Sequence, residues 1–182
     1  MGELVELLVE DERWAEMELA GLAERAVRAG IEARGLSPEG YVVSLLACDD
    51  ARMAALNAKY RGKAGPTNVL SWPAHVLAPA APGEAPRRPP PALPGRPEPL
   101  GDIAIGWERV TAEARAAGLD PAHHLQHLLV HATLHLLGYD HETEADAALM
   151  EGLESRTLAR MGLHNPYLYP GSLEESQPRQ EK

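Results

Sequence analysis

The stretch HATLHLLGYDH, His131–His141, carries the strongest structural signal in this chain. His131 and His135 are four residues apart, so on a helix both side chains project from one face. A helix rises about 1.5 Å per residue, and two imidazoles at this spacing can reach the same ion. Gly138 can adopt the left-handed conformation that ends a helix, which lets the chain turn His141 back toward the pair. The stretch therefore predicts a helix and a turn that together carry three metal ligands.

The same helix offers a competing set of three histidines. His127, His131 and His135 recur every four residues, but eight residues of helix separate the outer two by about 12 Å, too far for one ion. We therefore expect His141 as the third ligand, and expect His127 either to support the site from outside or to lie on the helix surface. Three neutral imidazoles without a fourth protein ligand leave one position open to water, as in catalytic zinc sites.

Metzincin proteases share these histidine offsets but place a glutamate directly after the first histidine as general base. This chain has Ala132 there, and a methyl group cannot accept a proton from water. Peptidase activity by that mechanism therefore lacks its base. Asp140, next to His141, is either a partial substitute or a turn carboxylate that binds local backbone N–H groups.

Composition limits the class of protein. A chain of 182 residues fits one domain, and its formal charge of −10 argues against broad, non-specific attraction to nucleic acid. There is neither an apolar run that spans a bilayer nor a signal-peptide pattern, so we expect no membrane partner. The single cysteine, Cys48, excludes an intramolecular disulfide and a Cys-rich zinc site, and we expect it to be a buried core thiol. Together these features favour a cytoplasmic protein.

A short basic run interrupts the acidic sequence at Lys59, Arg61 and Lys63. Such a patch can hold a phosphate through a short-ranged, salt-sensitive attraction. On spacing alone, a solvated loop of flexible charges explains the run equally well.

The hydrophobic pattern predicts an α+β (mixed α/β) fold, a four-stranded sheet flanked by about five helices. The strands are expected at residues 3–9, 41–48, 68–72 and 101–106. The helices are expected at residues 14–34, 49–60, 107–117, 142–161 and from 121 to the turn at Gly138. His123 and His124, near the start of the last of these, are expected to be solvated.

Nine of the sixteen prolines fall between Pro79 and Pro99. This segment suits neither a helix nor a β-ladder, so residues 78–99 are expected to form a mobile, partly extended insertion. It interrupts a single metal-dependent hydrolase domain, expected over residues 1–165, without dividing it. Residues 166–182 are expected to be a polar tail, disordered from Gly171 onward.

Four motifs in order resemble the YbeY family of bacterial endoribonucleases and ribosomal RNA maturation factors. They are YRGK (60–63), TNVLSWP (67–73), LGDIAI (100–105) and HATLHLLGYDH (131–141). The resemblance runs from about Asn57 to Met161. The chain departs from the family pattern at Ala132, where glycine is usual, at Trp72, where phenylalanine is common, and in the length of its proline-rich insertion.

The resemblance implies one Zn²⁺ per chain, held by His131, His135 and His141, and a functionally important arginine at Arg61. It also implies cleavage of single-stranded RNA, maturation of ribosomal RNA precursors, ribosome quality control and the small ribosomal subunit as a partner. The ligand set alone leaves the metal open, since three imidazoles also suit nickel, cobalt or copper.

Residue chemistry suggests roles for the neighbouring polar groups. Zinc lowers the pKa of a bound water to about 7, and the planar guanidinium of Arg61 can stabilise charge that develops on a phosphodiester. We expect Lys59 and Lys63 to position phosphates. Asn68 and Ser71 are expected either to bind substrate at a strand edge or to fill core or turn positions.

Three hypotheses remain open from the sequence. The first is a zinc-dependent endoribonuclease acting in ribosomal RNA maturation. The second is a metal-dependent hydrolase of another substrate, such as a peptidase that uses Asp140 or substrate assistance. The third is a non-enzymatic ribosome-assembly factor with a structural zinc.

Overall fold

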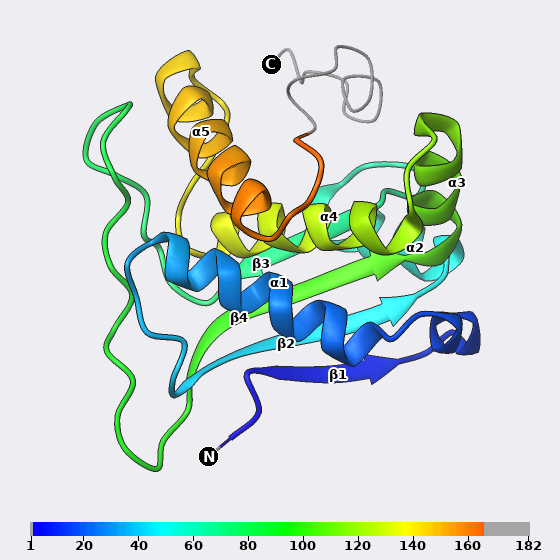
Figure 1. Ribbon diagram of the computed structural model, residues 1–182, viewed down its shortest axis with the longest axis horizontal. Helices are drawn as coiled ribbons and strands as arrows, with labels where there is room; N and C mark the ends of the chain where they lie inside the picture. Colours follow the sequence, from blue (N-terminus) through cyan, green and yellow to red (C-terminus); the bar gives the residue numbers. More distant parts are fainter. Residues whose placement is uncertain (1, 166–182) are drawn as a thin grey trace.

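The computed structural model describes residues 2–165, in which helices flank one four-stranded sheet (Figure 1). The strands are β1 (Val5–Val9), β2 (Tyr41–Cys48), β3 (Val69–Pro73) and β4 (Glu98–Gly106). The helices are the 3-10 helix η1 (Glu12–Glu16) and α1 (Leu19–Ala33), α2 (Asp50–Arg61), α3 (Trp107–Ala117), α4 (Pro121–Leu136) and α5 (Glu144–Arg160). This architecture confirms the predicted α+β fold.

The sheet is mixed, with strand order β1-β2-β4-β3. The strands β1, β2 and β4 are parallel, and β3 pairs antiparallel with β4 at one edge. Parallel strands are usually covered on both faces and read as continuous apolar runs. The run Tyr41–Cys48 fits this rule, because β2 lies inside the sheet.

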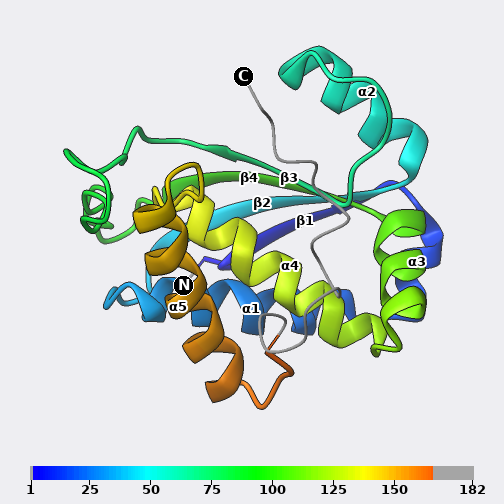
Figure 2. The same cartoon turned by 90° about the horizontal axis from the view of Figure 1, so that it is seen from above.

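Helices cover the two faces of the sheet unequally. The helices α1, α4 and α5 lie on one face, whereas α2 lies on the other (Figure 2). The larger core fills the first face and includes Ile31, Leu45, Ile103, Leu129 and Leu136. A smaller core lies on the face of α2 and consists of Cys48, Met53, Leu70 and Ala104. Cys48 is thus the buried core thiol that was predicted.

Local sequence signals set the ends of the helices. The side chain of Asp49 caps α2 by accepting a hydrogen bond from the backbone N–H of Arg52 at 2.8 Å, as N-cap aspartates do. Gly118 ends α3 in the left-handed conformation. Asp120 caps α4, whose first residue is Pro121, and a proline at this position sacrifices no hydrogen bond.

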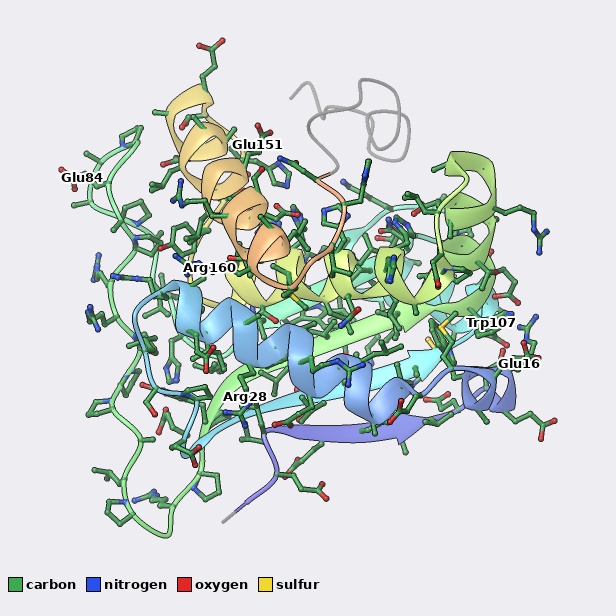
Figure 3. The ribbon with its side chains drawn as sticks, viewed as in Figure 1. Glu16, Arg28, Glu84, Trp107, Glu151 and Arg160 are labelled. Carbon is green, nitrogen blue, oxygen red and sulfur yellow. The ribbon has the colours of Figure 1, made fainter. Side chains whose placement is uncertain are left out.

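The helix predicted at residues 14–34 is wrong in its first turn. The chain forms η1 first, and an extended residue, Met17, separates η1 from α1. Trp14 explains the break, because its ring is buried and its Nε1 donates to the carbonyl of Cys48 at 2.9 Å. Trp107 packs edge-on against Trp14, with ring centroids 5.0 Å apart, and lies close to η1 (Figure 3). These contacts hold η1 against the end of the sheet, where α1 cannot extend.

The expectation that the proline-rich segment forms no ladder is wrong at its C-terminal end. Strand β4 begins at Glu98 and includes Pro99, three residues before the predicted start. The ladder between β2 and β4 shifts register between Val42 and Val43, and Leu100 is the extra residue on β4. Proline has no N–H to donate to the ladder, so within a sheet it is tolerated mainly beside such irregularities.

The rest of the proline-rich insertion is bound to the domain at several points. Arg34 donates to the carbonyl of Pro86 at 2.8 Å, and the hydroxyl of Tyr41 donates to the carbonyl of Pro90 at 3.0 Å. Leu77, just before the insertion, is buried. The mobility of the insertion stays a prediction, and the predicted polar tail lies outside the described residues.

None of the helices in the described part of the chain combines the length and apolarity needed to cross a membrane.

Candidate functional site

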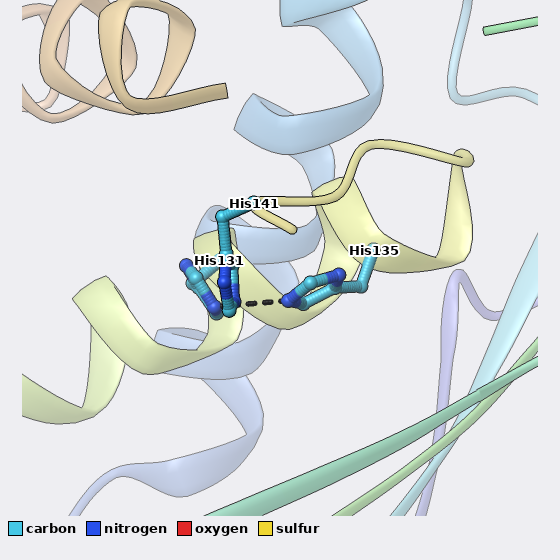
Figure 4. A group of neighbouring side chains, drawn as sticks. All are labelled: His131, His135 and His141. Atoms are coloured by element: carbon cyan, nitrogen blue, oxygen red, sulfur yellow. Dashed lines mark hydrogen bonds between the residues drawn. The ribbon is translucent and has the colours of Figure 1, made fainter. Parts of the chain in front are cut away.

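The three predicted ligands lie together in the structure. His131 and His135 project from the last turns of α4, and His141 follows the turn after it (Figure 4). One ring nitrogen from each histidine lies within 4.8 Å of the other two. The group could therefore hold a metal ion, and metal binding by these residues stays a prediction.

The turn that returns His141 to the helix is a Schellman motif. The N–H of Gly138 donates to the carbonyl of His135 at 3.0 Å, and the N–H of Tyr139 donates to the carbonyl of Leu134 at 3.1 Å. Gly138 has φ +96°, a conformation that side chains with a Cβ rarely adopt. The predicted role of Gly138 in ending the helix is thus confirmed.

The same turn orients His135. Its Nδ1 lies 2.9 Å from the carbonyl oxygen of Tyr139, and because a carbonyl only accepts, Nδ1 must carry the proton. Burial, with the charges of His131 and His141, lowers the pKa of His135 to about 3. The ring is therefore neutral, and the lone pair of its Nε2 is available to a metal.

A buried carboxylate orients His131. Oε2 of Glu154, on α5, lies 3.1 Å from Nδ1 of His131, and Oε1 lies 2.5 Å from Nε2 of His127. Burial alone would raise the pKa of Glu154, but positive charge on His131 and hydrogen bonds from both histidines lower it below its usual range. Glu154 is therefore ionised and directs the Nδ1 proton of His131 toward itself.

The donor set fits a metal ion. With Nδ1 of His131 and of His135 occupied as donors, each Nε2 offers its lone pair in the neutral form of the ring, which is the form that binds a metal. These two Nε2 atoms are only 3.0 Å apart, where lone pairs repel each other unless a cation or a proton lies between them. Imidazole ligands held by a carboxylate and a carbonyl behind them are the usual arrangement of protein zinc sites.

His141 completes the group from the more exposed side. Its ring centroid lies 5.5 Å from that of His131 and 5.1 Å from that of His135. Oδ1 of Asp140 accepts the backbone N–H of His141 at 2.7 Å. This contact favours the interpretation of Asp140 as a turn carboxylate.

The three remaining histidines of α4 lie in different surroundings. His127 supports the site from outside the ligand set through its bond to Glu154, which was one of its two predicted positions. His123 is exposed, as expected. The expectation that His124 is solvated is wrong, since it is 2% exposed and its Nε2 contacts Glu113 at 2.8 Å. Its position on α4 directs it toward α3, which carries that carboxylate.

Asn68 belongs to the same network as His124. Its Nδ2 donates to both carboxylate oxygens of Glu113, at 3.2 and 3.0 Å, and its Oδ1 accepts from the N–H of Val69 at 2.7 Å. The side chain is 5% exposed. These contacts join β3, α3 and α4, and the predicted contact of Asn68 with substrate stays a prediction.

The basic residues lie at the end of α2, on the other face of the sheet from α4. Nη2 of Arg61 donates to the carbonyl of Ser71 on the edge strand β3 at 2.6 Å. Nζ of Lys59 lies 5.0 Å from the ring centroid of Tyr60, and Lys63 is exposed. Arg61 therefore contacts β3, and none of these contacts of the three cations within the described residues reaches the three histidines.

The sequence reasoning missed Glu154 and Glu113. A usable signal existed for Glu154, which lies between Met150 and Leu158 at four-residue spacing on the buried face of α5. A carboxylate on an apolar helical face needs a partner, and histidines were already expected on the neighbouring helix. Glu113 is partly exposed and gave no comparable signal.

Comparisons with known proteins agree with the geometry. The sequence model of the family described as Endoribonuclease YbeY matches residues 7–162. A protein of Dinoroseobacter shibae named Endoribonuclease YbeY is 52% identical over 166 residues, 91% of each chain. A protein of Cereibacter sphaeroides with the same name is 50% identical and covers 92% of this chain and 100% of its own.

A solved structure shares the fold. The solution structure of TM1509 from Thermotoga maritima superposes with a TM-score of 0.50 and covers 97% of this chain and 99% of its own. The two sequences are 18% identical, so this likeness concerns the fold alone.

Proposed function

Since the chain belongs to the YbeY endoribonuclease family, we propose that it is a zinc-dependent endoribonuclease that cleaves single-stranded RNA during ribosomal RNA maturation. One observation carries the metal dependence. The Nε2 atoms of His131 and His135 face each other at 3.0 Å, with His141 beside them and each Nδ1 of the pair bound elsewhere.

The proposed cofactor is one Zn²⁺ per chain, with His131, His135 and His141 as its ligands. When bound, it would supply Lewis acidity and make a water molecule acidic enough to ionise near neutral pH. Glu154 and the carbonyl of Tyr139 hold the two helical ligands in the tautomer that such an ion needs. Ala132 provides no general base, so the ligand geometry does not favour a peptidase.

The protein's own cations act on the phosphate groups. Arg61 donates one of its five N–H groups to the carbonyl of Ser71. The other N–H groups of the guanidinium can bind the negative charge that develops on a phosphodiester. Lys59 and Lys63 hold neighbouring phosphates in position. Asn68 orders the start of β3, and a direct contact with substrate is part of the proposal.

The biological setting of the proposal comes from the family. The proposed substrate is a precursor of ribosomal RNA, and the proposed partner is the small ribosomal subunit. The proposal also includes a part in ribosome quality control and a cytoplasmic location. The hydrolase is proposed to be a single domain over residues 1–165. The competing hypothesis is an assembly factor whose zinc is structural.

The test combines metal analysis with cleavage of a labelled, unstructured RNA. We expect about one zinc per chain in the purified protein and loss of both zinc and cleavage in His135→Ala. His123→Ala is the matched control, because His123 is an exposed histidine on the same helix. It should retain both.

Three outcomes would reject the proposal. Cleavage that survives in metal-free His135→Ala would remove the metal from the reaction. Hydrolysis of an unfolded protein substrate with no cleavage of RNA would favour the peptidase. A protein that shows neither activity and unfolds when its metal is chelated would favour a structural zinc.

A further inference from the structure

A cavity of about 650 Å³ opens on the face of the sheet that carries α2. The metal-ligand candidates do not line it. Its walls include Leu8, Leu46, Leu56, Tyr60, Trp72 and Asp102. The cavity arises because α2 covers only part of this face (Figure 2), so the smaller core ends and apolar side chains such as Leu8, 62% exposed, remain uncovered.

Two aromatic rings form one side of the cavity. Tyr60, from α2, and Trp72, from β3, meet edge to face with ring centroids 5.6 Å apart. Nε1 of Trp72 is buried and has no hydrogen-bond partner among the described residues. Buried donors are normally satisfied, so the ring carries a polar group for which the described part of the chain supplies no acceptor.

A carboxylate lies next to the indole. Asp102 is the cross-strand neighbour of Trp72 in the antiparallel pair of β3 and β4. It is exposed, and within residues 2–165 it has no hydrogen bond or ion pair. Glu6, on β1, adds a second carboxylate to the lining. Both groups only accept hydrogen bonds, so they attract N–H donors and repel phosphates.

Positive charge gathers outside the cavity. Lys59 and Arg61 flank Tyr60 in the sequence, and Arg61 reaches the carbonyl of Ser71, the neighbour of Trp72. Lys59, Arg61 and Lys63 form no ion pair with any described residue. The chain has a net charge of −10, so three unpaired cations in one place are unusual for it. The cavity thus has acidic and aromatic walls, and basic residues lie near its rim. The arrangement suits a nucleotide whose base enters the cavity and whose phosphate meets Lys59, which lies 5.0 Å from the ring centroid of Tyr60. Arg61, bound to Ser71 at the β3 edge, stays available for the cleaved linkage.

We propose that this cavity binds the base of an unpaired nucleotide in the RNA substrate, and that Asp102 makes guanine the preferred base. Aromatic side chains stack on unpaired bases regardless of sequence, at about 1–3 kcal/mol per base. Guanine alone among the four bases presents two adjacent donors, N1–H and the N2 amino group, to a carboxylate. This inference rests on the proposed endoribonuclease function.

The bound nucleotide is not one that flanks the cleaved bond. The cavity is lined by residues on the face of the sheet that carries α2, whereas α4 lies on the other face (Figure 2). The edge strand on the side of β4 is β3. An RNA strand that occupies both places must pass around β3. The cavity therefore reads a base at a distance from the cleaved linkage and sets the sequence context of cleavage.

The first experiment titrates the purified protein with GMP and with IMP, which lacks only the 2-amino group, by calorimetry. We expect GMP to bind about tenfold more tightly than IMP, since a bidentate base contact discriminates by roughly 1–3 kcal/mol. Asp102→Asn should bind the two equally, and Trp72→Leu should weaken both. Glu151→Gln, an exposed carboxylate change on α5, and Trp107→Phe, a change outside the cavity lining, are the controls and should match the wild type.

The second experiment measures cleavage of single-stranded RNAs that carry one guanine or one inosine at successive distances from the cleaved bond. The KM should rise for inosine at one distance in the wild type and at none in Asp102→Asn. Equal affinity for GMP and IMP, or a difference that persists in Asp102→Asn, would overturn the inference. So would binding of a basic peptide, or Trp72-dependent self-association, in place of nucleotide binding.

The two proposals fail separately. Nucleotide binding is measured without turnover, so it remains informative if the protein proves not to cleave RNA. Metal-dependent cleavage that is lost in His135→Ala, together with no guanine preference, would leave the endoribonuclease proposal standing and reject the base-binding cavity.

Discussion

Glu154 and His131 connect α5 to the candidate metal site, with Oε2 of the carboxylate 3.1 Å from Nδ1 of the imidazole. Glu154 is fully buried, and its second oxygen contacts His127. A buried carboxylate needs hydrogen bonds to offset the loss of water, and both histidines supply such bonds to Glu154. The last helix is therefore part of the site, although it supplies none of the three candidate ligands.

We predict that Glu154→Gln weakens zinc binding by about 10–100-fold, the usual cost of removing a carboxylate behind a histidine ligand. The neutral amide keeps the size of the side chain but no longer fixes the Nδ1 proton of His131. Competition with a chromophoric chelator measures the affinity. Glu151→Gln, on the same helix but exposed, is the matched control, and equal zinc affinity in the two variants would contradict the proposed role.

Arg61→Ala should lower the rate of RNA cleavage by about 100-fold, because removing a donor to developing charge typically costs roughly that much. Arg61→Lys should recover only part of the loss, since an ammonium group lacks the planar fork. Arg61 is exposed, so both variants should melt close to the wild type. Arg52→Ala, an exposed arginine on the same helix, is the control; a similar decrease there would show a general charge effect.

The sequence predicted best where the signal was local. The cap at Asp49, the helix stop at Gly118 and the start at Pro121 each depend on the conformation of a few neighbouring residues. The convergence of His141 with the helical pair is also local, because Gly138 sets the turn. These features need no knowledge of distant packing.

The errors lie where distant contacts decide the structure. Trp14 fits a helical period, but its bond to Cys48 holds it in a separate 3-10 turn. Pro99 belongs to a strand because the ladder between β2 and β4 shifts register beside it, at Leu100. His124 is buried because Glu113, on another helix, pairs with it. In each case the partner lies in another helix or strand, and no periodicity reveals it.

The thiol of Cys48 should be inert in the folded protein. Burial raises its pKa to about 12, so the reactive thiolate is scarce at mildly alkaline pH. Because the folded pKa exceeds the unfolded value, this group favours the folded state less as the pH rises from about 9 to 12. Iodoacetamide labelling followed by mass spectrometry should show modification only after denaturation. Rapid labelling of the native protein would mean that the smaller core opens readily.

The proline-rich insertion should help to hold the turn that carries His141. A Cβ at Gly138 would lie 2.8 Å from the Cβ atoms of both Leu77 and Pro86 and 2.9 Å from the carbonyl oxygen of Leu77. These contacts are tighter than van der Waals packing allows. The segment that begins with Leu77 therefore packs directly on the turn between the second and third candidate ligands.

Gly138→Ala should therefore lower the free energy of unfolding by more than the strain of its left-handed backbone conformation alone. Gly118→Ala is the control, because Gly118 has φ +67° and a Cβ at this position would meet no atom within 4 Å. It should lose about 1–2 kcal/mol of unfolding free energy for the left-handed conformation. Gly138→Ala should lose roughly 1–3 kcal/mol more through overpacking, and only this variant should also bind zinc more weakly. Chemical denaturation and chelator competition separate the two effects. Equal stability losses, with unchanged zinc affinity in both variants, would show that the insertion does not hold the His141 turn in place.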